Sequence, residues 1–250
     1  MMIPLVAVGH GSRDPRSAAT VSELLGVVRA LDPGLDVRAA FLDLSAPRLV
    51  DVLGAVSGDG HREAVVVPLL LGSAFHARVD VPNAISEAVS RYPRLSVRIA
   101  EVLGPDPRLE SAALRRLAAA GVRLDDPSVG VVLAGAGSSH APANALVSAV
   151  ARRWAGGARW AGAVEAFAAA ADPTVPAAIS ALRAAGARRI AVASWFLAPG
   201  LLPDRVAEQA RAAAGDVVVA QPLGADIDVA ELVLHRYQAA LSCRVAARSA

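Results

Sequence analysis

The sequence contains no lysine and a single cysteine, and aromatic residues make up only 4% of its 250 positions. Without lysine there is no Walker phosphate loop, which requires a Gly-Lys-Ser/Thr step. The lone Cys243 excludes an internal disulfide and a cysteine-rich zinc or iron–sulfur site. Basic clusters interleaved with aromatics are also missing and the net charge is only +2, so we expect no binding to nucleic acid. Any metal site must use histidine and carboxylate ligands.

Charged residues are absent from one stretch, 127–151, that is long enough to cross a membrane. Its middle, GAGSSHAPA, places Gly, Ser, His and Pro where hydrocarbon tolerates them least, so we expect a strand, a loop and a helix there. The N-terminus shows no basic segment or cleavage site typical of a signal peptide. We therefore expect a cytoplasmic protein without membrane association.

Short β-branched runs alternate with longer Ala/Leu/Arg segments, which is the pattern of a parallel sheet with helical crossovers. With 54% hydrophobic residues, the chain can bury a large core. In the first half the expected strands are 3–9, 36–44, 64–72 and 96–103. The expected helices are 17–31, 46–56, 81–91 and 107–120.

The second half of the chain repeats the first. Gly104 matches Gly224 at an offset of 120, and five further pairs share an offset of 126: Gly9 and Gly135, Phe41 and Phe167, Pro47 and Pro173, Arg62 and Arg188, Val66 and Val192. We expect an α/β fold of two tandem domains, 1–124 and 125–250. Each should be a four-stranded, mainly parallel sheet flanked by helices, with ligands bound beyond the carboxyl ends of the strands.

Three polar side chains follow three of the expected strands. His10 follows the first strand, Asp43 ends the second, and His76 comes shortly after the third. Adjacent parallel strands lie about 4.8 Å apart, so these side chains could converge on one cation. Two imidazoles and a carboxylate suit Fe²⁺, Co²⁺, Ni²⁺ or Zn²⁺.

These residues also have ordinary structural interpretations. His10 could be a hydrogen-bonded loop residue. Asp43 could cap a helix, in a segment where Ser45 offers an N-cap and Pro47 a first-turn position.

The second repeat lacks all three side chains, because Ala136, Ala169 and Leu202 stand at the equivalent positions. If the three were only structural, both copies would be expected to need something polar there. The G-x-G-S pattern nevertheless persists in both copies. We therefore expect a site in the first half only, with the second half serving as a wall, a packing partner or a lid.

The GHGSRDP loop does not fit the dinucleotide-binding pattern, which needs three spaced glycines. Ser12, Arg13 and a helix N-terminus near Ser17 could instead hold a carboxylate. A small acidic ligand therefore fits this loop better than a nucleotide.

HGSRDPRS, FLDLSAP and VVVPLLLGSAFHARVDVP together resemble the class II tetrapyrrole chelatases of the sirohydrochlorin chelatase family (CbiX/SirB type). Long members of that family are two fused chelatase-like domains, so the resemblance covers the whole chain. His10 and His76 match the family's two active-site histidines, and Asp43 matches a metal-side carboxylate that is often Glu. The resemblance implies insertion of Fe²⁺ or Co²⁺, with Ni²⁺ as a further candidate, into sirohydrochlorin, for sirohaem or cobalamin synthesis. The metal is then a substrate, and no prosthetic group is expected.

The resemblance also implies roles for individual residues. His10 would bind the metal and accept a pyrrole proton, His76 would be the second ligand, and Asp43 would orient the site or be the third ligand. The residues expected to contact the macrocycle are Ser12, Arg13, Leu71, Gly72, Ser73, Ala74 and Phe75. We expect a monomer whose two halves form one cleft around the ring.

Other classes compete with this interpretation. A non-catalytic carrier of the metal or the tetrapyrrole would use the same ligands, and turnover assays separate it from an enzyme. A periplasmic-type binding protein also has two α/β lobes, but it would need a signal peptide. A hydrolase is disfavoured because Ser138 lacks the G-x-S-x-G flanks of a nucleophile elbow.

Overall fold

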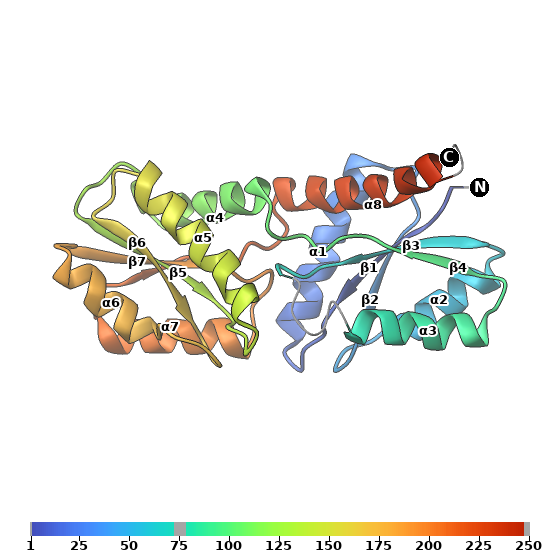
Figure 1. The fold of residues 1–250 in the computed structure, drawn as a ribbon, viewed down its shortest axis with the longest axis horizontal. Coiled ribbons are helices and arrows are strands. Elements are labelled where there is room, and N and C mark those ends of the chain that lie inside the picture. The colour runs from blue at the N-terminus through green and yellow to red at the C-terminus, as the bar shows by residue number, and fades with distance from the viewer. Residues whose placement is uncertain (1, 73–78, 248–250) are drawn as a thin grey trace. The chain divides into compact units, whose positions relative to one another are not determined.

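The chain folds into two four-stranded parallel sheets, each with helices on both faces (Figure 1). The computed structural model describes residues 2–72 and 79–247. This architecture confirms the predicted α/β class and the predicted pair of sheets. Within the described ranges, no helix combines the length and the apolarity that crossing a membrane requires.

The first sheet has the strand order β2-β1-β3-β4, with every neighbouring pair parallel. Its strands are β1 (Leu5–Gly9), β2 (Val37–Phe41), β3 (Glu63–Pro68) and β4 (Ser96–Ile99). The helices after these strands are α1 (Pro15–Leu31), α2 (Leu49–Gly58), α3 (Val81–Arg91) and α4 (Pro107–Ala119). Every residue of β1 is buried, because this central strand has helices on both faces.

Alternation along β1 divides the core of the first sheet into two layers. Val6 and Val8 pack with the apolar faces of α2 and α3. The opposite face of the sheet is covered by α1 and by α8 (Ile227–Ala247), the last helix of the chain. The carboxyl ends of β1, β2 and β3 are thereby left at one edge.

The second sheet repeats this plan with the order β6-β5-β7-β8, again fully parallel. Its strands are β5 (Val129–Gly135), β6 (Gly162–Phe167), β7 (Arg189–Ser194) and β8 (Val218–Val219). The helices that connect them are α5 (Ala141–Gly157), α6 (Val175–Ala184) and α7 (Leu201–Ala213). One face packs against α6 and α7, whereas α4 and α5 lie on the other. The segment 127–151 is thus strand, loop and helix, as predicted.

The two compact units are not the two sequence repeats. Pro107–Leu223 form one unit, and the chain on either side of it forms the other. Helix α4, which ends the first repeat, packs against β7, and α8, which ends the second, packs against β3 and α1. Each repeat therefore gives its last helix to the other sheet, a feature that the division at 1–124 and 125–250 does not describe.

Two arginines 120 positions apart each bind the exchanged helix to a main-chain carbonyl at the matching position, Leu103 or Leu223. Arg236 of α8 donates from Nε to the Val102 carbonyl at 2.9 Å and from Nη2 to the Leu103 carbonyl at 3.0 Å. Arg116 of α4 donates to the Leu223 carbonyl from Nε at 3.0 Å and from Nη2 at 2.7 Å. Leu103 and Leu223 are also 120 positions apart, so the exchange is reciprocal.

Candidate metal and substrate site

The structure brings His10 and Asp43 together at the carboxyl edge of the first sheet. His10 is the first residue after β1, and Asp43 is the second after β2, the neighbouring strand. Main-chain pairing continues beyond the strands, because Leu42 N donates to the Gly9 carbonyl and Asp43 N to the His10 carbonyl, each at 3.0 Å. The main chains of the two candidate ligands are therefore held in fixed register.

Gly11 permits this close approach. Its φ is +95°, in the left-handed region that favours glycine. A Cβ at this position would lie 1.6 Å from the Asp43 carbonyl oxygen. The backbone conformation and the close contact with Asp43 therefore require glycine at the second glycine position of the G-x-G pattern.

Ser45 joins the loop after β2 to the loop after β1 by two hydrogen bonds. Ser12 N donates to Ser45 Oγ at 3.0 Å, and Ser45 Oγ donates to the Ser12 carbonyl at 2.9 Å. The interpretation of Ser45 as an N-cap is wrong, since α2 begins only at Leu49, after Arg48. Nothing in the pattern FLDLSAP by itself indicates this partner, because the bond joins residues 33 positions apart.

The side chains of the pair face different environments. The imidazole of His10 is half-buried, and its Nδ1 lies 3.2 Å from the Gly11 carbonyl. The carboxylate of Asp43 is exposed, and its Oδ1 accepts a hydrogen bond from Leu44 N at 2.8 Å. Asp43 is therefore not a helix cap, and its carboxylate is accessible to a cation.

The loop after His10 leads into α1, which begins at Pro15 rather than near Ser17. Asp14 is the N-cap and accepts a hydrogen bond from Arg16 N at 2.9 Å. The hydrogen bond from the Arg16 side chain lowers the pKa of Asp14 below its ordinary value. Because a carboxylate already occupies this helix end, an anionic ligand is better served by the exposed Arg13.

The third strand contributes less to the described site. Leu71 and Gly72 are half-buried, three and four residues beyond the end of β3. His76, Ser73, Ala74 and Phe75 lie outside the described residues. Within 2–72 and 79–247, no three His, Cys, Asp or Glu side chains form a group that could hold a metal ion. The His10, Asp43 and His76 set stays a prediction.

The second sheet carries the same backbone without the candidate ligands. Ala168 N and Ala169 N donate to the carbonyls of Gly135 and Ala136, at 2.9 and 3.0 Å. A Cβ on Gly137 would lie 1.9 Å from the Ala169 carbonyl oxygen. The glycines thus persist for a backbone reason, while the side chains at the positions of His10 and Asp43 are reduced to methyl groups.

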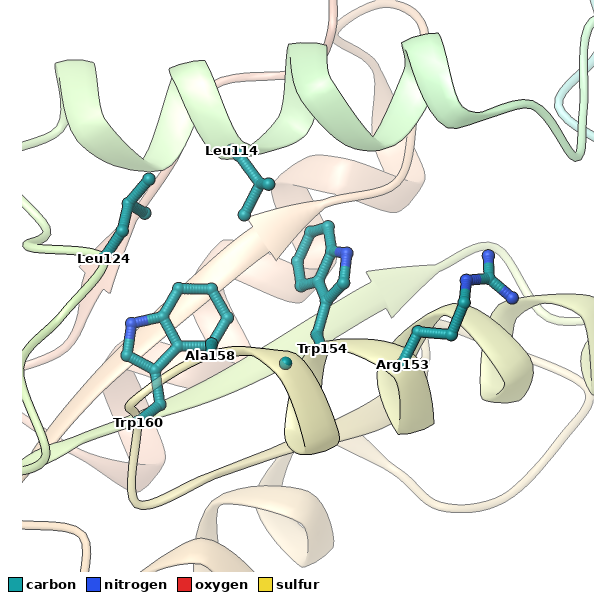
Figure 2. Close-up of a pocket in the computed structure, with 7 residues that line it drawn as sticks. Leu114, Leu124, Arg153, Trp154, Ala158 and Trp160 are labelled. Atoms are coloured by element: carbon teal, nitrogen blue, oxygen red, sulfur yellow. The ribbon is translucent and has the colours of Figure 1, made fainter.

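A pocket of about 280 Å³ lies elsewhere, in the second unit (Figure 2). Trp154 and Trp160 meet edge to face in it, with ring centroids 6.0 Å apart. Figure 2 shows Leu114 pointing from α4 toward the ring of Trp154, and Leu124 also lines the pocket. None of the predicted site residues lines this pocket.

Known proteins resemble the chain over nearly its full length. It is 25% identical to the sirohydrochlorin ferrochelatase of Priestia megaterium, over 97% of this chain and 92% of that one. It is 24% identical to the sirohydrochlorin cobaltochelatase of the same organism, over 84% and 69% of the two chains. The solved structure of SirB from Bacillus subtilis with Fe³⁺ superposes with a TM-score of 0.79 at 25% identity, over 95% of each chain.

A second solved structure supports the fold alone. CbiX, described as the terminal enzyme for siroheme biosynthesis in denitrifying bacteria, superposes with a TM-score of 0.67 at 20% identity, over 95% of this chain and 99% of that one. The CbiX family model matches twice, at residues 4–120 and 130–240, which confirms the internal repeat. Both repeats are therefore CbiX repeats, and the chain belongs to the CbiX family.

Proposed function

We propose that this protein inserts a divalent metal ion, Fe²⁺ or Co²⁺, into sirohydrochlorin. The observation that carries the proposal is the main-chain hydrogen bond that holds His10 and Asp43 side by side at the carboxyl edge of the first sheet. The second sheet repeats this backbone with alanine at both positions. The similarity to a ferrochelatase and a cobaltochelatase supports the same reaction. Neither metal is favoured by the ligand types alone.

The metal enters the reaction as a substrate. His10 and His76 supply imidazole nitrogens and Asp43 supplies an oxygen, a borderline donor set that leaves coordination positions open for the pyrrole nitrogens. Insertion replaces two pyrrole N–H protons, so one M²⁺ enters and two H⁺ leave. A neutral imidazole has one unprotonated nitrogen, so His10 first binds the metal through it and accepts a pyrrole proton there once the metal has passed to the ring nitrogens. His76 and Asp43 hold the cation until that transfer, and the second proton leaves to water.

The periphery of the macrocycle carries carboxylates, which need cationic and N–H partners. Arg13 is exposed beside the candidate ligands and offers a planar guanidinium for bidentate contact. Ser12, next to Arg13 in the same loop, is proposed as a second contact to the macrocycle. The residues proposed to line the ring from the third strand are Leu71, Gly72, Ser73, Ala74 and Phe75.

An anaerobic insertion assay tests the proposal. Purified protein is mixed with excess sirohydrochlorin and Co²⁺ or Fe²⁺, and the loss of the metal-free absorption spectrum is followed. We expect multiple turnovers, and a loss of at least about 100-fold in kcat/KM for His10→Ala and for His76→Ala. Asp43→Asn should lose less if Asp43 only orients the site.

His235→Ala is the matched control, because His235 is exposed on α8 and lies outside the proposed site. It should keep full activity. Tight binding of the macrocycle with at most one turnover would show that the protein is a carrier and not an enzyme. Full activity in His10→Ala would show that His10 does not take part in the mechanism.

The compartment and the oligomeric state stay predictions. We propose that the protein is cytoplasmic, and we propose a monomer because one chain contains both repeats. Sedimentation equilibrium at several protein concentrations tests the monomer, and a mass twice that of the chain would contradict it.

A further inference from the structure

Leu44 combines an unusual backbone conformation with an exposed side chain. Its φ is +60°, a conformation that L-residues rarely adopt because Cβ crowds the neighbouring carbonyl. Ser45 N donates to the Asp43 carbonyl across it at 2.7 Å, so Leu44 is the centre of a tight turn. Leu44 is 47% exposed. A large apolar side chain left exposed at the centre of such a turn raises the question of what it contacts.

The turn that carries Leu44 is fixed to the loop that carries His10. Asp43 N, on one side of Leu44, donates to the His10 carbonyl, and Ser45, on the other side, exchanges two hydrogen bonds with Ser12. Leu44 is thus held at the same edge as the two candidate metal ligands, with little freedom to move away from them.

The second repeat shows that the turn does not require a leucine. Ala170, at the position of Leu44, has a φ of +59°. Alanine therefore suffices for this turn. The copy that lacks the candidate ligands also lacks the larger apolar side chain. Of the two equivalent positions, only the one beside His10 and Asp43 carries leucine.

We propose that Leu44 is a substrate-contact residue whose side chain rests against the apolar face of the sirohydrochlorin ring. This role rests on the proposed function and adds a residue to it. The carboxylates of the macrocycle lie at its periphery, whereas the ring face gains by leaving water for an aliphatic surface. Leu44 then holds the plane of the ring beside His10, while Arg13 binds at the periphery.

Binding of sirohydrochlorin without metal tests this contact directly. Leu44→Asn is the main variant, because asparagine tolerates a left-handed backbone and removes the apolar surface. We expect its Kd for sirohydrochlorin, followed by absorption, and its KM for sirohydrochlorin to rise roughly tenfold. The KM for Co²⁺ and the thermal midpoint should change little. Leu44→Ala, which the second repeat shows to be compatible with the turn, should behave likewise, and Leu44→Met should bind nearly as wild type.

Leu31→Ala is the matched control, since Leu31 is a 40% exposed leucine at the far end of α1. It should leave the Kd unchanged. Binding by Leu44→Asn within twofold of wild type would overturn the contact while leaving metal insertion by the wild type intact. A wild type that neither binds nor metallates sirohydrochlorin would instead overturn the proposed function, and this contact with it.

Discussion

Gly11 determines how closely the two loops of the candidate site approach each other. We expect Gly11→Ala to lower the free energy of unfolding by more than about 3 kcal/mol, because the added Cβ meets the Asp43 carbonyl oxygen at 1.6 Å and the φ of +95° is unfavourable for alanine. Metal insertion should fall as well, since His10 and Asp43 lose their register. Urea unfolding and the insertion assay measure the two effects.

Gly60→Ala is the matched control for backbone strain alone. Gly60 has a similar φ, +90°, but an added Cβ would meet nothing within 4 Å. Its substitution should cost only about 1–2 kcal/mol. Equal losses in the two variants would show that backbone strain, and not the contact with Asp43, explains the glycine.

Residues at strand ends could be predicted from the sequence, whereas their partners could not. His10 and Asp43 follow two apolar runs, and parallel strands place such ends at one edge. The bond between Ser12 and Ser45 and the left-handed turn at Leu44 depend on how two distant loops meet. No local pattern contains that information.

At the scale of elements, Tyr237 attaches α8 to the start of the first sheet. Its Oη donates to the Ile3 carbonyl at 2.6 Å, and burial raises the pKa of the phenol. The folded state therefore holds this proton more tightly than the unfolded chain does. The resulting stabilisation is complete below the unfolded pKa, about 10, and is lost as the pH rises through the folded pKa.

We expect the wild type to lose stability above about pH 10, a range in which no lysine titrates because the sequence has none. Tyr237→Phe should be about 1 kcal/mol less stable at neutral pH, because the Ile3 carbonyl loses its donor. Its stability should then vary less between pH 9 and 11. Urea unfolding across this range measures both, with Tyr92→Phe, which alters the other of the two tyrosines, as the control. Parallel pH curves for wild type and Tyr237→Phe would contradict the assignment.

The hydrogen bonds of Arg116 in α4 and Arg236 in α8 should contribute more to the free energy of unfolding than exposed ion pairs do. Arg236→Met keeps an apolar stem but leaves the Val102 and Leu103 carbonyls without their donor. It also leaves Asp106, 3.5 Å away with a side chain only 12% exposed, without this cation. We expect a loss of about 2–4 kcal/mol in the free energy of unfolding, measured in urea.

Arg116→Met should also destabilise the second unit, by a smaller amount of about 1–3 kcal/mol, because both bonds of Arg116 go to the single Leu223 carbonyl. Arg91→Met is the control, since its pair with Glu87 joins two exposed side chains and should contribute less than about 0.5 kcal/mol. Comparable losses for Arg91→Met and Arg236→Met would contradict a special role for the two equivalent arginines.

Most elements were predictable because each is a local pattern. The expected helices 81–91 and 107–120 correspond to α3 and α4 within one residue. The expected strand 64–72 instead ends at Pro68, because an apolar run alone does not reveal where pairing stops. The helix 46–56 begins three residues late, at Leu49, after a loop that the apolar pattern does not mark.

At the scale of the whole molecule, the sequence repeat and the folding unit differ. An amphipathic helix has the same periodicity whichever sheet it covers, so the sequence could not assign α4 to β7 or α8 to β3. The structure predicts that fragment 107–223, which is continuous and holds a sheet with all its covering helices, folds alone. Fragment 125–250, although it is one repeat, lacks α4 and carries an α8 whose sheet is missing.

Urea unfolding followed by circular dichroism separates the two fragments, which are of similar length. We expect fragment 107–223 to unfold in one cooperative transition, because its sheet keeps α4 and α5 on one face and α6 and α7 on the other. Fragment 125–250 should unfold gradually and bind a hydrophobic dye, since the surface of β7 that α4 covers is open to water. Adding fragment 1–124 should restore its cooperative transition by returning α4 to β7. If 125–250 alone unfolded as cooperatively as 107–223, the exchange of helices would be dispensable, and each repeat would fold as a unit by itself.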